Sequence, residues 1–176
     1  FSKRSYFLVV ARNDPAKNYS NLLSAYKSYL ISGGSLRLVV CGFNPPESFY
    51  DIYPYMLPYS SSIDIYGFLS SDMLISLYSS ARALLLYSES ELWGLVVNEA
   101  MAARVPCVVS SRCGVTSSLA IDEVTCIIVD PFSPASLTTV LFRVEYMSTT
   151  EYNFLTYLNL YRFNTSFMHL GVLGFW

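Results

Sequence analysis

Residues 88–111 read SESELWGLVVNEAMAARVPCVVSS. This stretch begins where one apolar run ends, opens an amphipathic helix near Leu95, and closes in a second apolar run, VPCVVSS. Three glutamates surround the helix start, namely Glu89, Glu91 and Glu99. A helix dipole favours acidic side chains at the amino end, which accounts for part of this clustering. An apolar run, a helix and a second apolar run, in this order, are typical of a parallel α/β unit.

The same alternation extends along the whole chain. The six short, β-branched runs are SYFLVVA ending at Ala11, SLRLVVCG ending at Gly42, SIDIYG ending at Gly67, ARALLLYS ending at Ser88, VPCVVSS ending at Ser111 and TCIIVDP ending at Pro131. Helical spacing fills residues 18–34, 70–81 and 133–147 between them. The sequence therefore predicts an α/β fold, a Rossmann-like, doubly wound and mostly parallel sheet of about six strands with helices on both faces. Ligands of such sheets bind at the carboxyl ends of the strands.

Composition limits the classes of function. The chain has 176 residues, a hydrophobic fraction of 53% and a formal net charge of −2, with no block of Lys or Arg. These values argue against a nucleic-acid partner, which requires a cationic surface. No membrane span or signal peptide is visible, so we expect a cytoplasmic protein, possibly peripheral to a membrane. Four cysteines without CxxC spacing and a single His predict buried free thiols and no metal site.

The pattern changes near the end of the chain. Residues 1–148 carry the alternating elements, whereas residues 149–176 are aromatic and only weakly periodic. We expect 149–176 to form a C-terminal helix, at about 151–162, and an apolar tail, packed on this domain or on a missing neighbour. A membrane-surface anchor is an alternative, although the segment lacks a cationic face. The chain begins at Phe1 and enters a strand almost at once, which indicates a piece of a longer protein.

Charged residues gather in loops at predicted carboxyl ends of strands. ARNDPAKN follows the first strand and holds Arg12 and Lys17 on either side of an Asp14-Pro15 turn. Either both cations converge on one anion, or they are two solvated surface charges. The third and fourth strands are followed by GFLSSD and SESELWG. Motifs for Rossmann-type NAD binding, a P-loop or a GxSxG nucleophile are absent.

The helix that opens near Leu95 is a second candidate element. Its first amides lack intrahelical acceptors, and Gly94 permits close approach of a ligand to the backbone. Together with Arg12 and Lys17, this helix start describes a diphosphate pocket. Leu95 and Glu99 lie one above the other, away from the stripe that packs on the sheet. The Glu99 carboxylate either accepts hydrogen bonds from a vicinal diol or is a solvated helix residue.

These motifs in combination resemble a known family. ESELWGLVVNEAMAARVPCVVSS, VVARNDPAKN, and LRLVVCG followed by IDIYGFLSSDMLISLYSSARALLLYSES are similar to segments of retaining, nucleotide-sugar-dependent glycosyltransferases of group 1 (family 4-like), which have the two-lobed GT-B fold. Glu91 and Glu99 match the E-x7-E pair of that family, and the similarity covers roughly Tyr6–Met147. The resemblance implies that the chain is the carboxyl-terminal, donor-binding lobe, with residues 1–148 binding the nucleotide sugar.

The resemblance also implies roles for individual residues. Arg12 and Lys17 would grip the donor diphosphate and Glu91 would face the transferred sugar, which makes these three the expected catalytic residues. Glu99 would accept the ribose hydroxyls. The remaining donor contacts would come from amides near Gly94, Leu95 and Val96, and from backbone around Gly67, Phe68 and Leu69 that borders the base.

Other expectations concern cofactors and partners. The family generally uses no bound metal or cofactor, so the donor itself, a nucleotide diphosphate sugar, is the expected ligand. The expected partners are an unknown acceptor and the N-terminal acceptor lobe of the same parent chain, with possible peripheral membrane contact.

The sequence departs from the family pattern in three places, of which Ala11, in place of the glycine before Arg12, is the mildest. Arg104 replaces the glycine that commonly ends the helix with positive φ, which costs about 1 kcal/mol. The loop 113–118 lacks the usual acid. These departures leave open a degenerate, non-catalytic lobe that acts as a binding or scaffold module. A third alternative is another nucleotide-sugar enzyme, such as an epimerase or a phosphorylase.

Overall fold

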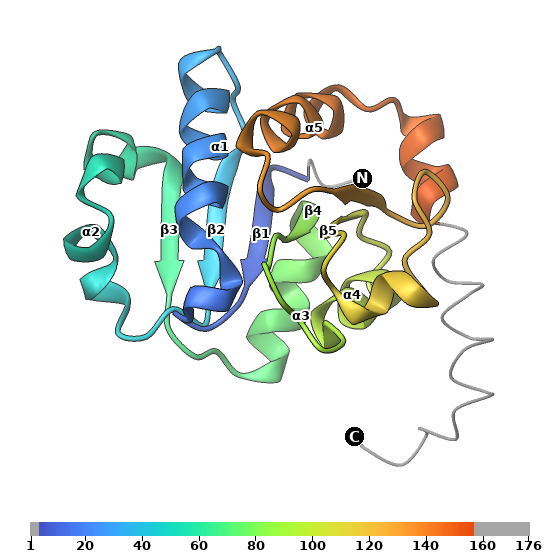
Figure 1. Cartoon of the computed structure of the whole chain (residues 1–176), viewed down its shortest axis with the longest axis horizontal. Helices are drawn as coiled ribbons and strands as arrows, with labels where there is room; N and C mark the ends of the chain where they lie inside the picture. Colours follow the sequence, from blue (N-terminus) through green and yellow to red (C-terminus); the bar gives the residue numbers. More distant parts are fainter. Residues whose placement is uncertain (1–3, 157–176) are drawn as a thin grey trace.

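A computed structural model describes residues 4–156, which form a six-stranded sheet between two layers of helices (Figure 1). The strands are β1 (Tyr6–Val10), β2 (Arg37–Cys41), β3 (Ile63–Tyr66), β4 (Ala81–Leu86), β5 (Cys107–Ser110) and β6 (Ile127–Val129). Their order is β3-β2-β1-β4-β5-β6, and every neighbouring pair is parallel. The predicted Rossmann-like sheet of about six strands is confirmed. Its order reverses between β1 and β4, the place where a crevice opens at the carboxyl edge.

Helices cover both faces of this sheet, as predicted. The α-helices are α1 (Tyr19–Ile31), α2 (Phe49–Ile52), α3 (Ser71–Ser80), α4 (Leu95–Ala102) and α5 (Pro134–Tyr146), and the 3-10 helices are η1 (Pro15–Lys17), η2 (Pro46–Ser48), η3 (Pro54–Ser62) and η4 (Gly114–Ser117). α1 and α5 pack on one face and share a core with α2 and η3. α3 and α4 pack on the other face.

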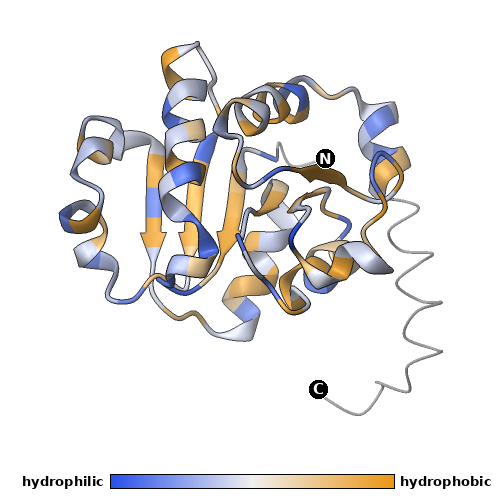
Figure 2. Cartoon of the chain, viewed as in Figure 1, coloured by the Kyte–Doolittle hydropathy of each residue, from blue (hydrophilic) through white to orange (hydrophobic). Residues whose placement is uncertain are grey.

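Alternation along the strands explains why the apolar runs are continuous. Phe7 and Val9 of β1 belong to the core under α1 and α5, whereas Leu8 belongs to the core under α3 and α4. A strand buried on both faces needs apolar side chains at every position. Figure 2 shows this as an almost uninterrupted hydrophobic colour along the central strands.

Local signals set the helix ends. Gly33 has φ of +94° and ends α1, and the Ser133 side chain accepts a hydrogen bond from the Ser136 amide at the start of α5. Pro134 takes the first helical position, where a missing N–H is harmless. These positions agree with the ends of the helical ranges predicted at 18–34 and 133–147. Ser70 flanks α3 as predicted, but its side chain makes no capping hydrogen bond.

Residues 43–62 form a short helical excursion that the sequence pattern did not indicate. Phe43 and Phe49 pack edge to face with ring centroids 5.1 Å apart, and the tilted rings of Phe49 and Tyr53 lie 5.4 Å apart. Pro54 and Pro58 interrupt any regular period there. Packing between aromatic rings therefore stabilises this connection between β2 and β3, and the sequence there has no helical period that would reveal it.

Residues 149–156 are helical and pack on this domain. The ring of Tyr152 is buried, and the guanidinium groups of Arg4 and Arg82 each lie 5.1 Å from its centroid. The remainder of the predicted C-terminal segment, residues 157–176, lies outside the described residues, as do residues 1–3. The predicted division at residue 148 therefore stays a prediction. Within residues 4–156, none of the helices combines the length and the apolar character that crossing a bilayer requires.

The end of α4 provides a test of backbone strain. Arg104 has φ of +56°, in the left-handed region, as the family pattern predicted for this position. The next amide, that of Val105, donates to the Ala100 carbonyl 2.9 Å away, which completes the helix terminus.

Replacing Arg104 by Gly is expected to raise the free energy of unfolding by about 1 kcal/mol, because glycine adopts positive φ without a Cβ penalty. Urea denaturation measures the change. Arg104→Ala is the matched control, since it removes the guanidinium but keeps the Cβ, and it is expected to give no gain. Equal stability of Arg104→Gly and wild type would contradict the strain at this residue.

Candidate active site

The loops that follow β1, β4 and β5 meet at the carboxyl edge, where the strand order reverses (Figure 1). Three backbone hydrogen bonds, each 2.9 Å long, tie them in series. The Glu89 amide donates to the Ala16 carbonyl, and the amides of Gly114 and Val115 donate to the carbonyls of Glu91 and Trp93, respectively. Main-chain hydrogen bonds therefore help to hold the three loops in register.

The loop after β1 is bent by its own side chains. The Asp14 carboxylate accepts a hydrogen bond from the Ala16 amide at 2.8 Å, and Pro15 begins η1. Asn18 then takes φ of +57°, and its side-chain amide donates to the Pro131 carbonyl at 2.8 Å. The predicted Asp14-Pro15 turn is confirmed. The buried Asn18 anchor fixes the end of η1 and with it the position of Lys17.

Lys17 forms an ion pair with Glu91 across the crevice. Both side chains are about one-fifth exposed, so they are shielded from water but reachable from the crevice. The sequence predicted that Lys17 faces the diphosphate and Glu91 faces the sugar. The structure brings these two groups together and makes them direct partners. Arg12 is exposed, and among residues 4–156 it has no ion pair and no contact that joins it to Lys17 or α4.

Gly94 shapes the start of α4. Its φ is +98°, and a Cβ built there would lie 2.7 Å from the Leu86 side chain. Leu95 and Val96 follow as the first two helical residues, whose amides have no acceptor within the helix. The indole of Trp93 donates to the side-chain oxygen of Asn98 at 3.1 Å and secures the turn. The helix start therefore presents backbone donors to the crevice.

Glu99 lies one helical turn after Leu95 and is half-buried. Leu95 is 67% exposed, which confirms that this side of α4 does not pack on the sheet. The hydroxyl of Tyr78, from α3, donates to Oε2 of Glu99 at 2.8 Å. Burial, followed by the nearby Glu99 charge, raises the pKa of Tyr78. Tyr78 was not predicted as a site residue, because its spacing places it in the apolar stripe of α3.

A buried thiol lies beside the ion pair. Cys113 is 2% exposed, and burial together with the Glu91 charge raises its pKa to about 11. All four cysteines are buried and free, as the sequence predicted: Cys41, Cys107, Cys113 and Cys126. Across residues 4–156, His, Cys, Asp and Glu side chains nowhere form a group of three or more that is placed to hold a metal ion.

The predicted base-bordering residues follow β3 at the same edge. The Gly42 amide donates to the Gly67 carbonyl at 3.0 Å, and Phe68 is 69% exposed. Leu69 is partly buried against the core of α3 and α4. Among residues 4–156, no hydrogen bond or ion pair joins Gly67, Phe68 or Leu69 to Lys17, so their part in the site rests on the shared edge and on the packing of Leu69.

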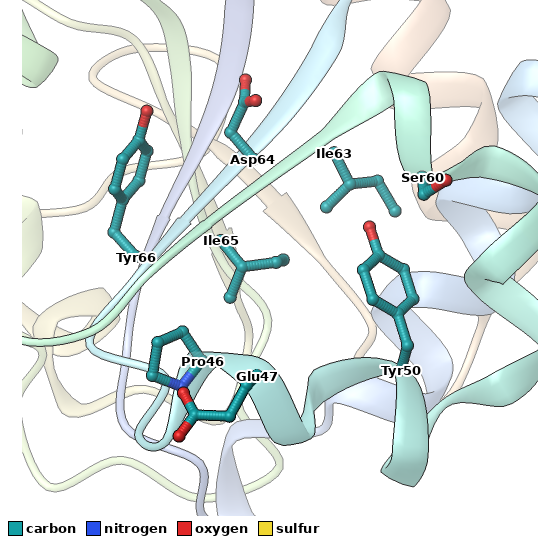
Figure 3. A pocket seen from close by; sticks show the side chains of 8 residues that line it. All are labelled: Pro46, Glu47, Tyr50, Ser60, Ile63, Asp64, Ile65 and Tyr66. Atoms are coloured by element: carbon teal, nitrogen blue, oxygen red, sulfur yellow. The ribbon is translucent and has the colours of Figure 1, made fainter.

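A depression of about 570 Å³ lies on the outer side of β3 and contains none of the predicted site residues (Figure 3). Tyr50 and Pro46 form one wall and strand β3 with Tyr66 forms the other. It approaches the predicted site at Gly67, which directly follows the lining residue Tyr66 and where a Cβ would lie 3.7 Å from Pro46. The predicted site at the switch point therefore does not coincide with this depression.

Comparison with known proteins supplies the identification. Residues 1–147 match the family described as glycosyl transferases group 1. The chain belongs to this family. The glycosyltransferase domain is also 31% identical, over 137 residues, to an uncharacterized glycosyltransferase of Methanocaldococcus jannaschii; the alignment covers 78% of this chain and 35% of that relative. The chain thus spans about a third of the length of the curated relative it matches.

Solved structures of glycosyltransferases share the fold. A UDP-forming α,α-trehalose-phosphate synthase from Burkholderia vietnamiensis has a TM-score of 0.78 at 14% identity, covering 96% of this chain and 43% of that one. A trehalose-6-phosphate synthase studied for glycosyl transfer with retention has a TM-score of 0.75 at 16% identity, covering 92% and 41%. The glycosyltransferase domain therefore has the architecture of one GT-B lobe, as predicted.

Proposed function

We propose that this glycosyltransferase domain is the donor-binding lobe of an enzyme that transfers a sugar from a nucleoside diphosphate to an acceptor, with retention of configuration and without a bound metal. The observation that carries the proposal is the Lys17–Glu91 pair, which lies beside the first turn of α4 at the switch point of the sheet. Family membership and the likeness to a synthase studied for transfer with retention add support.

The chemistry follows from the charges. When the glycosidic bond to the leaving nucleotide breaks, negative charge grows on the β-phosphate. In this proposal Lys17, Arg12 and the amides of Leu95 and Val96 stabilise that charge, which is the main source of catalysis in such transfers. The departing sugar becomes cationic, and the Glu91 carboxylate favours it electrostatically. These cationic groups take the role that a divalent ion plays elsewhere, so the lobe needs no metal for the diphosphate.

In this proposal the groups that bind the acceptor lie outside this domain. The other lobe of the parent enzyme supplies the acceptor groups, and closure of the two lobes completes the site. The alternative of a degenerate binding module was suggested by Arg104 and by loop 113–118. Arg104 keeps the glycine-like backbone conformation, and loop 113–118 keeps its backbone bonds to residues 91–93. Neither departure therefore favours loss of activity.

Nucleoside diphosphates are expected to stabilise the chain. Thermal unfolding is measured with UDP, GDP and ADP at millimolar concentration, and a ligand at a hundred times its Kd adds about 2.7 kcal/mol, or about 5–10 °C in Tm for a chain of this size. Lys17→Ala is expected to abolish the shift. Lys27→Ala, which removes a lysine of α1 that contacts Tyr55, is the matched control and should keep it. No shift with any of the three nucleotides would overturn the proposed function.

A further inference from the structure

Tyr78 stands out among the residues near the crevice because it joins two helices through a charged group. It belongs to α3, whereas Glu99 belongs to α4, and the two helices pack side by side on the same face of the sheet. The Tyr78 side chain is 3% exposed, and its hydroxyl lies 2.8 Å from Oε2 of Glu99 and 3.5 Å from the Val96 carbonyl.

The hydrogen bond occupies one side of the carboxylate only. Within residues 4–156, Oε1 of Glu99 has no hydrogen-bond partner, and the side chain is half-buried and reachable from outside. A glutamate on a helix surface otherwise samples several rotamers, and a ligand that binds it must immobilise the side chain. A buried donor that holds Oε2 removes this freedom before any ligand arrives.

The direction of the bond is fixed as well. Burial and the adjacent negative charge raise the pKa of the Tyr78 hydroxyl, so it remains protonated and always donates. Oε1 and the remaining lone pair of Oε2 therefore stay available as acceptors for hydroxyl groups. The carboxylate presents an acceptor face of fixed orientation beside the first turn of α4.

We infer that Tyr78 is a positioning residue for donor recognition: it holds Glu99 in the orientation that accepts the two ribose hydroxyls of the nucleotide, and thereby sets the preference for ribonucleotides. This inference rests on the proposed donor-binding function. Tyr78 touches no substrate atom and acts through Glu99.

The test compares Tyr78→Phe with wild type by isothermal titration calorimetry. The probes are whichever of UDP, GDP and ADP stabilises the wild-type chain most and the 2′,3′-dideoxy form of the same nucleotide. Phenylalanine keeps the buried ring and removes only the donor. We expect affinity for the ribonucleotide to fall about tenfold, because a hydrogen bond to a charged group is lost, while affinity for the dideoxy form changes less than twofold.

A second variant separates positioning from general damage. Glu99→Gln is expected to reduce the ribose preference by itself, and adding Tyr78→Phe to it should have no further effect on that preference. Melting curves of all variants verify folding, and a variant with a lowered Tm is titrated at a lower temperature.

The outcomes distinguish the two levels of the proposal. An equal loss for both nucleotides, or an unchanged ribose preference in Tyr78→Phe, overturns the positioning role but leaves the proposed function intact. A wild-type chain that binds no nucleoside diphosphate overturns the function and the inference together. A ribonucleotide-specific loss in Tyr78→Phe that disappears in the Glu99→Gln background supports the inference.

Discussion

Lys17→Ala is expected to lower kcat/KM of the proposed two-lobed parent enzyme by about 10²–10³-fold. Lys17 is the partly shielded cation at the switch point, and it lies beside Glu91, where the scissile bond of the donor would be placed. Removing one preorganised group that faces developing charge typically has an effect of this size. Steady-state kinetics with saturating acceptor measures the loss, which should appear in kcat as well as in donor KM, because the charge grows in the transition state.

Glu91→Gln provides the informative comparison. It leaves Lys17 without its counter-ion, so binding of a sugar-free nucleoside diphosphate should become tighter while transfer becomes slower. The two substitutions thus shift nucleotide affinity in opposite directions, although both impair catalysis. Lys27→Ala again serves as the neutral control. A kcat/KM within threefold of wild type for Lys17→Ala would remove the electrostatic basis of the proposed mechanism.

Gly114→Ala is expected to reduce the free energy of unfolding on the order of 3 kcal/mol, because overpacking against main chain has no easy relief. A Cβ on Gly114 would lie 1.9 Å from the Leu92 carbonyl oxygen and 3.3 Å from Cα of Trp93. Relief of this clash must separate loop 111–115 from loop 89–94, and the Gly114–Glu91 backbone hydrogen bond would break. Denaturant unfolding measures stability, and nucleotide titration should show weaker binding, because loop 89–94 leads into the first turn of α4 and displaces it.

Gly33→Ala is the matched control for this substitution. Gly33 has a positive φ of +94°, yet a Cβ there would meet nothing within 4 Å. Its expected cost is about 1–2 kcal/mol from backbone strain alone, with no change in nucleotide affinity. If Gly114→Ala were no more destabilising than Gly33→Ala, then the contact between the two loops would not constrain the site.

Most of the fold could be predicted because its determinants are local. Runs such as FLVV and LVVC are apolar at every position, which only a strand buried on both faces requires. Gly33, Ser133 and Pro134 mark helix ends by their own backbone chemistry. Residues 43–62 were not predicted, since tertiary ring packing holds them and Pro54 and Pro58 hide any period.

The sequence indicated which residues lie in the candidate site, but it did not indicate which of them contact one another. Lys17 and Glu91 are 74 positions apart, and nothing local indicates that they form an ion pair. Tyr78 has the spacing of a core residue, and its ring is in fact buried, so only its hydroxyl distinguishes it. A tyrosine within an otherwise aliphatic stripe, on the helix before the fourth strand, is the signal that could have indicated it. The roles assigned to all the predicted site residues, Lys17, Glu91 and Glu99 included, stay predictions.

The three hydrogen bonds that join the loops after β1, β4 and β5 run from peptide group to peptide group. Such bonds are indifferent to the identity of the side chains that the loops carry, apart from the glycine that allows the closest approach. The side chains of exposed residues such as Arg112 and Ser117 take no part in these bonds, so we expect their substitution to leave the first turn of α4 in place. Under the proposed function, donor choice can change at these positions on an unchanged scaffold, and a library randomised there would be the natural starting point for altering it.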